Sequence, residues 1–442
     1  MATTGKSWVV DRLEELRTRL QGVRKPGDSI PVIQVAAISG PAMVALESGM
    51  RRSVSALLRD IEKLLRLARQ LDQGPSNRLK FVNKKLTLLQ LKADSLFSTF
   101  DMLQDATAIR ADAKTGRLLR GVDVLLEHAL RRPIPGYTAP MAIGYLDSSG
   151  RGGAIARART RLPGGFILPT ALVRVSPESL PLRLSSSLNH EVGHQLTADT
   201  SLLGDATRRV TSVVMRTTGN AAAAKLFGSW SNELMADAWS VVLGGGVPVM
   251  DGLQRVLSLP EPILYAFRPG PHPVGPVRVQ FSYEASRLTF PDPALDRLRR
   301  RFDEIYGAPS VPDSLKQRLR PLLRSVPGVA RALINRPFEG LGGKTLAQCG
   351  EGWRLHPRRI RRLIPMIQKA RVSELVELAP LQALAALGYA RVLGALPVDD
   401  LNRLASAWLG GLAERRFRGA RSLDLKQRPI SKSRTQTMRM MQ

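Results

Sequence analysis

The sequence predicts a mainly α-helical protein with one small β-sheet, an α+β fold. Large apolar residues recur every three or four positions within residues 8–130 and again after residue 290, which is the period of an amphipathic helix. Between these regions, residues 141–168 contain short apolar runs that Gly- and Pro-containing turns interrupt, a pattern typical of strands. We therefore expect two helical regions on either side of a central unit that holds the sheet.

The amino-terminal region, residues 1–132, is expected to contain a helical hairpin. The turn Gly74-Pro75-Ser76-Asn77 separates two periodic segments of similar length, which is typical of antiparallel helices. His128 lies in the last helix of this region, where we expect a residue of the helix face and not a metal ligand. The helices are predicted at residues 8–23, 41–73, 79–113 and 118–130.

The central unit, residues 133–290, begins where Pro133 and Pro135 interrupt the helical pattern. A helix is expected to begin near Pro181, and Gly244-Gly245-Gly246 is expected to end a later helix. Strands are predicted at residues 141–146, 154–160 and 166–168. These strands would form a small sheet beside the helix that begins near Pro181.

The carboxyl-terminal region, residues 291–412, is again predicted to be helical. The helices are expected at residues 294–306, 314–323, 358–370, 373–396 and 399–412. The last segment, residues 413–442, is rich in basic residues and has few large apolar residues other than Met. We expect this tail to be disordered or to become ordered only on a partner.

The chain carries a net charge of +29. Roughly +16 of it lies after residue 290 and only about +4 within residues 133–290. Such a field attracts nucleic acid, anionic lipid or an acidic protein, whereas an arginine-rich composition from a GC-rich genome explains the same charge without a partner. The densest basic run, residues 353–362, either contacts phosphates or forms a solvated helix face.

The single cysteine, Cys349, excludes a disulfide framework and a cysteine-based metal site, and we expect a buried thiol. Charged residues from Asp11 onward interrupt any apolar segment of signal-peptide length, and no later run reaches about 18 uncharged apolar residues. The expectation is a soluble protein that is cytoplasmic as synthesised. Non-classical export and injection into another cell stay open.

Two of the five histidines lie only four residues apart, in His190-Glu191-Val192-Gly193-His194. On a helix, this spacing places both imidazoles on one face, about one turn apart, where they can bind one metal ion. The glutamate between them then faces the water on that ion and can act as a general base. The motif predicts a Zn²⁺ site with His190 and His194 as ligands and Glu191 as the base.

A second segment, residues 231–239, is predicted to be a mostly buried helix that carries Glu233 and Asp237. Glu233 is expected to be the third ligand, which leaves a fourth position open, as a catalytic zinc requires. Asp237, one turn later, is expected to hold a ligand histidine through its other ring nitrogen. The alternative is that both carboxylates lie on a solvated helix face.

The pairing of these motifs resembles the gluzincin metallopeptidases, the thermolysin-like clan. In that clan, H-E-x-x-H is followed on a second helix by a glutamate ligand and by an aspartate four residues later, which here are Glu233 and Asp237 in Asn232-Glu233-x-x-Ala236-Asp237. The resemblance implies a zincin-type metallopeptidase unit, with Asn232 and Asp237 supporting the ligands.

A third motif, His272-Pro273-Val274-Gly275-Pro276-Val277-Arg278, looks like the H-P-x-x-x-x-R signature of the peptidases related to HtpX and the CAAX prenyl proteases. In that group the histidine and arginine flank the zinc and help to bind the substrate carbonyl or its oxyanion. The alternatives are a plain loop histidine for His272 and a salt-bridge partner for Arg278. The resemblance covers about residues 150–290 and lacks the membrane spans of that group.

The three motifs predict a zinc-dependent endopeptidase that acts on a protein or peptide. In gluzincins an edge strand aligns an extended substrate, and residues 153–159 are the candidate for it here. One alternative is a basic protein that associates with nucleic acid or a particle, in which the peptidase unit is accessory or inactive. A contiguous basic surface would favour this alternative. A pseudoenzyme is a third possibility, against which the intact Glu191 argues.

Overall fold

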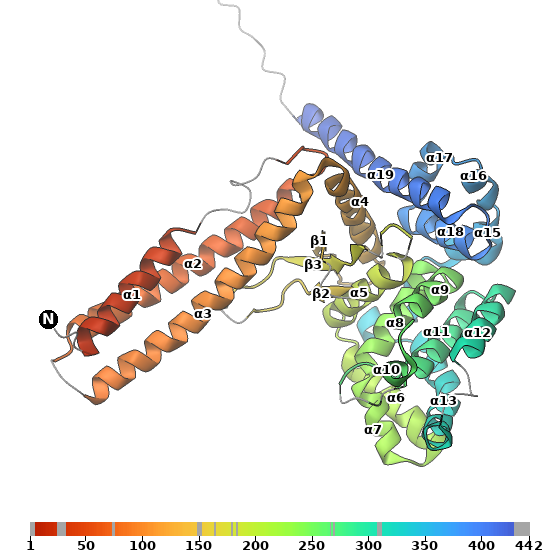
Figure 1. Ribbon diagram of the computed structural model, residues 1–442, viewed down its shortest axis with the longest axis horizontal. Helices are drawn as coiled ribbons and strands as arrows, with labels where there is room; N and C mark the ends of the chain where they lie inside the picture. Colours follow the sequence, from red (N-terminus) through yellow and green to blue (C-terminus); the bar gives the residue numbers. More distant parts are fainter. Residues whose placement is uncertain are drawn as a thin grey trace, which may run out of the picture.

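The computed structural model describes residues 5–23, 32–72, 76–147, 153–162, 165–177, 180–182, 184–265, 267, 270–306 and 312–427. It is mainly helical, with 73% helix and 5% strand, which confirms the predicted mainly-α class with a small sheet. In Figure 1, three long helices form an arm that projects from a larger helical body, and the sheet lies where the two meet. Among the described residues, no helix is long and apolar enough to cross a bilayer.

The arm consists of α1 (Gly5–Gln21), α2 (Gly40–Arg69) and α3 (Asn77–Ala108). As predicted, α2 and α3 form a hairpin, and α1 packs on both (Figure 1). The Ser76 side chain accepts a hydrogen bond from the backbone N–H of Leu79 at 3.1 Å and so caps α3. Leucines at helical spacing on all three helices form a core, which includes Leu13, Leu16, Leu46, Leu65, Leu86 and Leu96.

A buried ion pair holds the arm on the sheet. Arg110 lies in the 3-10 helix η2 (Ile109–Ala111), and Asp123 lies in α4 (Ala113–Leu130). Nη1 and Nη2 of Arg110 donate to Asp123 at 3.0 and 2.9 Å, and Nη2 also donates to the Gly144 carbonyl at 2.7 Å. Asp123 accepts the Gly144 N–H at 2.8 Å. Because so many hydrogen bonds satisfy both charges, the pair can remain buried.

The sheet has three strands, β1 (Met141–Leu146), β2 (Ala154–Ala156) and β3 (Thr170–Val175), in the order β1-β3-β2. β1 runs parallel to the central strand β3, whereas β2 is an edge strand antiparallel to it. The prediction for β1 is confirmed. The strand predicted at residues 154–160 is real but ends after Ala156, because a turn with Arg159 at a positive φ of 65° follows.

The sequence prediction missed β3 and wrongly made residues 166–168 a strand. Ile167 forms only an isolated bridge with Arg161. Five of the six residues of β3 are buried. The strand was not predicted because its sequence shows no alternation of polar and apolar side chains. Leu172 packs into the arm core, and Val173 packs into the core of the body. The sheet therefore joins the two cores.

The first half of the body is built from nine helices within the described residues. They are α5 (Leu184–Asp199), α6 (Leu203–Thr218), α7 (Ala221–Ser229), α8 (Ser231–Gly244), α9 (Gly246–Val256), α10 (Glu261–Leu264), α11 (Gly275–Thr289), α12 (Pro293–Tyr306) and α13 (Asp313–Ile334). The predicted helices near Pro181 and at Glu233 are confirmed, as is the glycine break after α8. α13 runs past the predicted end at residue 323, through Pro327, because its apolar face stays buried as far as Ile334.

The second half of the body contains shorter helices. They are η4 (Glu339–Leu341), α14 (Leu346–Cys349), η5 (Gly352–Leu355), α15 (Pro357–Arg361), α16 (Ile364–Gln368), α17 (Val372–Glu377), α18 (Pro380–Val392) and α19 (Val398–Gln427). The single helices predicted at 358–370 and 373–396 each divide in two, and Pro380 begins the second part of the latter. Cys349 is buried, as expected.

The prediction that residues 413–442 are disordered is wrong for the first half of this segment. α19 continues to Gln427 because tertiary contacts hold its end: Ala413 is buried, Arg415 donates to the Val376 carbonyl, and Arg416 pairs with Glu127 at 3.2 Å. Residues 428–442 lie outside the described residues. One continuous core reaches from α4 to α19, so the predicted boundary at residues 290/291 does not separate two cores.

Candidate metal centre

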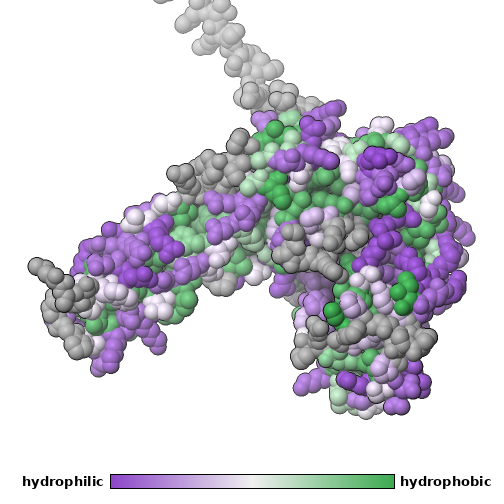
Figure 2. All heavy atoms as spheres, viewed as in Figure 1, coloured by the Kyte–Doolittle hydropathy of each residue, from purple (hydrophilic) through white to green (hydrophobic). Residues whose placement is uncertain are grey.

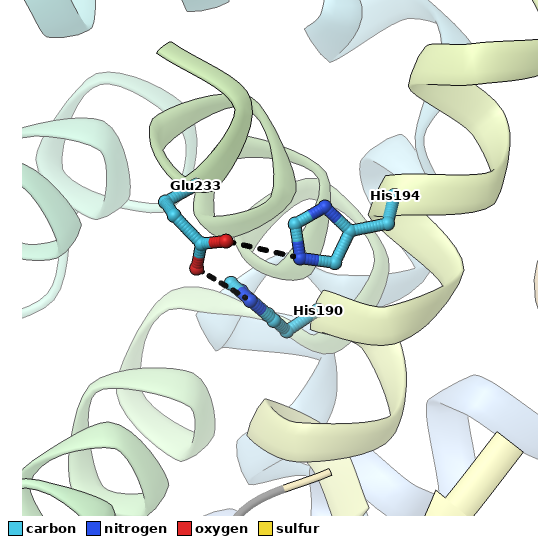
Figure 3. A group of neighbouring side chains, drawn as sticks. All are labelled: His190, His194 and Glu233. Atoms are coloured by element: carbon cyan, nitrogen blue, oxygen red, sulfur yellow. Dashed lines mark ion pairs between the residues drawn. The ribbon is translucent and has the colours of Figure 1, made fainter. Parts of the chain in front are cut away.

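Two helices bring three potential metal ligands together. His190 and His194 lie one turn apart on α5, and Glu233 faces them from the first turn of α8 (Figure 3). Nε2 of His190 lies 3.3 Å from one Glu233 carboxylate oxygen, and Nε2 of His194 lies 3.5 Å from the other. The three ligand atoms, one from each residue, all lie within 4.8 Å of one another. Among the described residues, these three form the group that could hold a metal ion.

Close packing of α5 on α8 makes this geometry possible. A Cβ at Gly193 would lie 2.8 Å from the Cα of Ala236 and 2.9 Å from the Cβ of Trp239, so only glycine allows this approach. α8 is buried along almost its whole length, including Glu233 and Asp237. The alternative of a solvated helix face for these two carboxylates is therefore wrong.

Asp237 orients the first histidine, as the sequence predicted. Nδ1 of His190 donates to Oδ1 of Asp237 at 2.8 Å, which leaves Nε2 free to face Glu233. Burial and the Arg278 guanidinium lower the pKa of His190, but Asp237 and Glu233 outweigh them and raise it to about 9. The imidazole is therefore protonated at neutral pH when no metal competes for Nε2.

Arg278, on α11, binds the same carboxylate. Its Nε and Nη2 donate to the two oxygens of Asp237 at 2.7 and 2.8 Å, in a buried, bidentate ion pair. Nη2 also lies 3.1 Å from Nδ1 of His190. Despite burial, the ion pair keeps the pKa of Asp237 below its ordinary value. Of the two roles considered for Arg278, the geometry matches the salt-bridge partner of Asp237.

His194 is the more weakly basic of the two histidines. Burial, followed by the positive charge of His190, lowers its pKa to about 4. Asn232, the predicted supporting residue, interacts with the ring and opposes this shift, although no described residue makes a hydrogen bond of ordinary geometry to Nδ1. The His194 ring is therefore neutral at neutral pH, and one of its nitrogens is available as a ligand atom.

The carboxyl group of Glu191 lies at the same cavity, as a general base would. Burial raises its pKa above the ordinary value. A Cβ at Gly153 would lie 2.8 Å from Oε1 of Glu191, so the backbone at the start of edge strand β2 runs directly past this group. Within the candidate segment, residues 153–159, Gly153 lines the cavity, and Ala154–Ala156 form the edge strand β2 that follows it.

His272 comes from the loop before α11. Its Nδ1 lies 3.1 Å from Oε2 of Glu233, yet 69% of its side chain is exposed. His272 therefore stands at the mouth of the site, where a ligand can reach it. All the predicted site residues, from three separate motifs, meet at one place in the fold.

A cavity of about 270 Å³ opens beside these groups. Apart from the residues already described, its walls come from α5, α8, α9 and α11 and are formed by Ser186, Ser187, Ser240, Val249, Leu253, Val256 and Ser282. A second, mainly apolar cavity of about 350 Å³ lies on the other side of His272 and is lined by Leu257, Ile263 and Leu264, among others. Val249, Leu253, Val256 and Ser282 were not predicted as wall residues, because their helices, α9 and α11, were not predicted.

The donor set fits zinc. Tetrahedral zinc with bonds of about 2.0–2.1 Å separates its ligand atoms by roughly 3.3 Å, close to the observed 3.3 and 3.5 Å between the imidazoles and the carboxylate. Two neutral imidazole nitrogens and one carboxylate also leave a fourth position for a ligand from the cavity. Comparison with protein-family models, with curated proteins and with solved structures gives no match. The functional interpretation therefore depends on this geometry.

Proposed function

We propose that this protein is a zinc-dependent endopeptidase. The observation that carries the proposal is that Glu191 lines one cavity with His190 and Glu233, two members of a donor set that His194 completes. Three protein ligands leave one coordination position open. A structural zinc site has four protein ligands and needs no adjoining cavity. A catalytic site needs both the open position and the base.

Each polar residue then has a separate role. Zinc would supply a Lewis acid that lowers the pKa of a coordinated water and polarises the scissile carbonyl. Glu191 takes a proton from the attacking water and passes it to the leaving amine, for which a pKa raised by burial is suited. Asp237 and Arg278 act as positioning residues, because they bind each other and Asp237 holds His190.

His272 is the candidate for stabilising the oxyanion. It is exposed at the point where the two cavities adjoin, so a carbonyl oxygen of a bound peptide can approach its ring. An extended peptide can add to β2, which pairs on one side with β3 and with no other strand of the described residues. Gly153 would then place the peptide backbone next to Glu191.

The experiment is metal analysis of the purified protein together with cleavage of a peptide library by the wild type and by Glu191→Gln. The variant should keep one zinc and its fold, but lose turnover by about 10²-fold or more, the scale of a positioned general base. Equal turnover by the two proteins would mean that Glu191 is not the base or that a contaminant cleaves the peptides. A wild type without zinc would overturn the proposal.

A further inference from the structure

An exposed tryptophan lies within the densest basic run of the chain. Trp353, in η5, is 60% exposed, which is unusual for so large an apolar side chain. Leu355, Pro357 and Ile360, which follow it in the chain, are buried and fix the local backbone. The His356 ring packs against the indole at 4.7 Å between centroids. The indole is thus presented on a rigid support and does not cover the core.

Several cationic side chains follow this indole closely in the sequence. Between Glu351 and Glu374 the sequence contains no acidic residue. Three arginines of this stretch, Arg354, Arg361 and Arg371, have acidic partners, which are Glu351, Asp292 and Glu374. The other basic side chains of the run are exposed and form no ion pair with a described residue; they are Arg358, Arg359, Arg362 and Lys369. Together with Trp353, these four residues are called the Trp353 surface.

Figure 2 shows hydrophilic side chains along the right edge of the body, where Figure 1 places α15 and α16. Arg358 and Arg359 lie in α15, and Arg362 lies between α15 and α16. A hydrophilic face with an open indole is suited to a partner that offers negative charge and a flat apolar ring at short spacing. A single-stranded nucleic acid has both, because its bases are free to stack while its phosphates remain accessible.

We propose that the Trp353 surface binds single-stranded nucleic acid, with a base stacked on Trp353 and phosphates paired with Arg358, Arg359 and Arg362. Two other polyanions fit less well. The phosphates of a duplex would use the arginines but leave the indole without a base, and an acidic protein segment offers no ring of this kind. This inference does not depend on the proposed peptidase activity.

The surface is separate from the metal centre. The N–H of Glu351, two residues before Trp353, donates to the Val242 carbonyl at 3.1 Å, near the carboxyl-terminal end of α8. Glu233 lies in the first turn of that helix, nine residues before Val242, and thus about 14 Å away along the axis at 1.5 Å per residue. Substitutions on the Trp353 surface should therefore leave the zinc content unchanged.

The test is fluorescence anisotropy of labelled 20-nucleotide single strands, with the full chain and with variants. Trp353→Ala should weaken binding about 10-fold through lost stacking. The triple variant Arg358→Gln/Arg359→Gln/Arg362→Gln should weaken it further and reduce the slope of log affinity against log salt by about 2, since each phosphate contact contributes about 0.7. Binding should also quench tryptophan fluorescence in the wild type more than in Trp353→Ala.

The matched control removes the same charge elsewhere. Arg297, Arg300 and Arg320, on α12 and α13, are also exposed and form no ion pair with a described residue. Their triple Gln variant should keep affinity within about 2-fold of the wild type if the Trp353 surface is the site. Equal losses in the two triple variants would overturn the proposal in favour of unspecific charge. Preference for a duplex or an acidic polypeptide, unaffected by Trp353→Ala, would overturn it as well.

Discussion

Asp237 lies between His190 and Arg278 and binds both: Nδ1 of His190 donates to its Oδ1 at 2.8 Å, and the guanidinium of Arg278 donates to both of its oxygens. This arrangement fixes the ring so that Nε2 faces Glu233. A histidine held in its ligand orientation before metal binding loses less conformational freedom on binding. Zinc affinity should therefore depend on a residue that does not touch the metal.

Asp237→Ala should weaken zinc binding about 10- to 100-fold while all three ligands remain. The measurement is competition for zinc against a chromophoric chelator of known affinity. Asp205→Ala is the control, because Asp205 lies on α6 and its described ion pairs are with Arg208 and Arg209. Unchanged affinity in Asp237→Ala would assign Asp237 a purely structural role.

His190→Ala and Glu233→Ala should each abolish stoichiometric zinc, because two remaining protein ligands do not hold the metal firmly. Metal analysis after dialysis against a weak chelator measures this. His356→Ala also removes one histidine but leaves the site intact, so it should retain one zinc per chain. Full zinc in both ligand variants would refute the ligand assignment.

Zinc affinity should rise with pH across the neutral range. The pKa of His190 is raised to about 9, so zinc must displace a proton from its ring at lower pH. His194, with its pKa lowered to about 4, contributes no second proton at neutral pH. We expect affinity to increase about tenfold per pH unit between pH 6.5 and 8.5, with release of about one proton per zinc. Calorimetry in buffers of different ionisation enthalpy measures the number of protons released. A zinc affinity that does not change with pH would contradict the conclusion that His190 is protonated in the metal-free protein.

Gly193→Ala should reduce zinc binding without altering a ligand. The added Cβ would meet backbone atoms of Ala236 at 2.8–2.9 Å and push α5 away from α8, which separates both histidines from Glu233. Gly204→Ala is the control, because its Cβ would meet only the flexible end of Arg208, at 3.7 Å. Zinc content and thermal melting of both variants check the expectation. Equal zinc content in Gly193→Ala and the wild type would show that the helices can adapt.

The residues of the metal centre were predictable because their chemistry is encoded at short spacing. His190 and His194 need only a helix to share a face, and the same holds for Glu233 and Asp237. The sequence did not show that Nε and Nη2 of Arg278 would both donate to Asp237, because that pairing is set by the packing of α11, a helix that was not predicted. The cavity walls from α9 were missed for the same reason.

The fold was predictable where the hydrophobic period is strong and local. The long amphipathic helices of the arm have such a period, whereas β3 is buried on both faces and has none. The end of α19 could not be inferred from composition, since Arg415 and Arg416 are ordered there by partners more than 35 residues away in the chain. Tertiary contacts of this kind override local sequence preference.

The Arg110–Asp123 pair should be the most sensitive polar contact between the arm and the sheet. Both side chains are almost completely buried, at 0% and 1% exposed. Removing the Asp123 carboxylate leaves the Arg110 charge without water and without a counter-ion, at a cost of about 3–5 kcal/mol. Asp123→Ala should lower the free energy of unfolding by this amount in chemical denaturation. Glu62→Ala, which breaks the exposed pair with Arg17, should change it by about 0–1 kcal/mol. Similar effects in the two variants would mean that solvent reaches the Arg110 site.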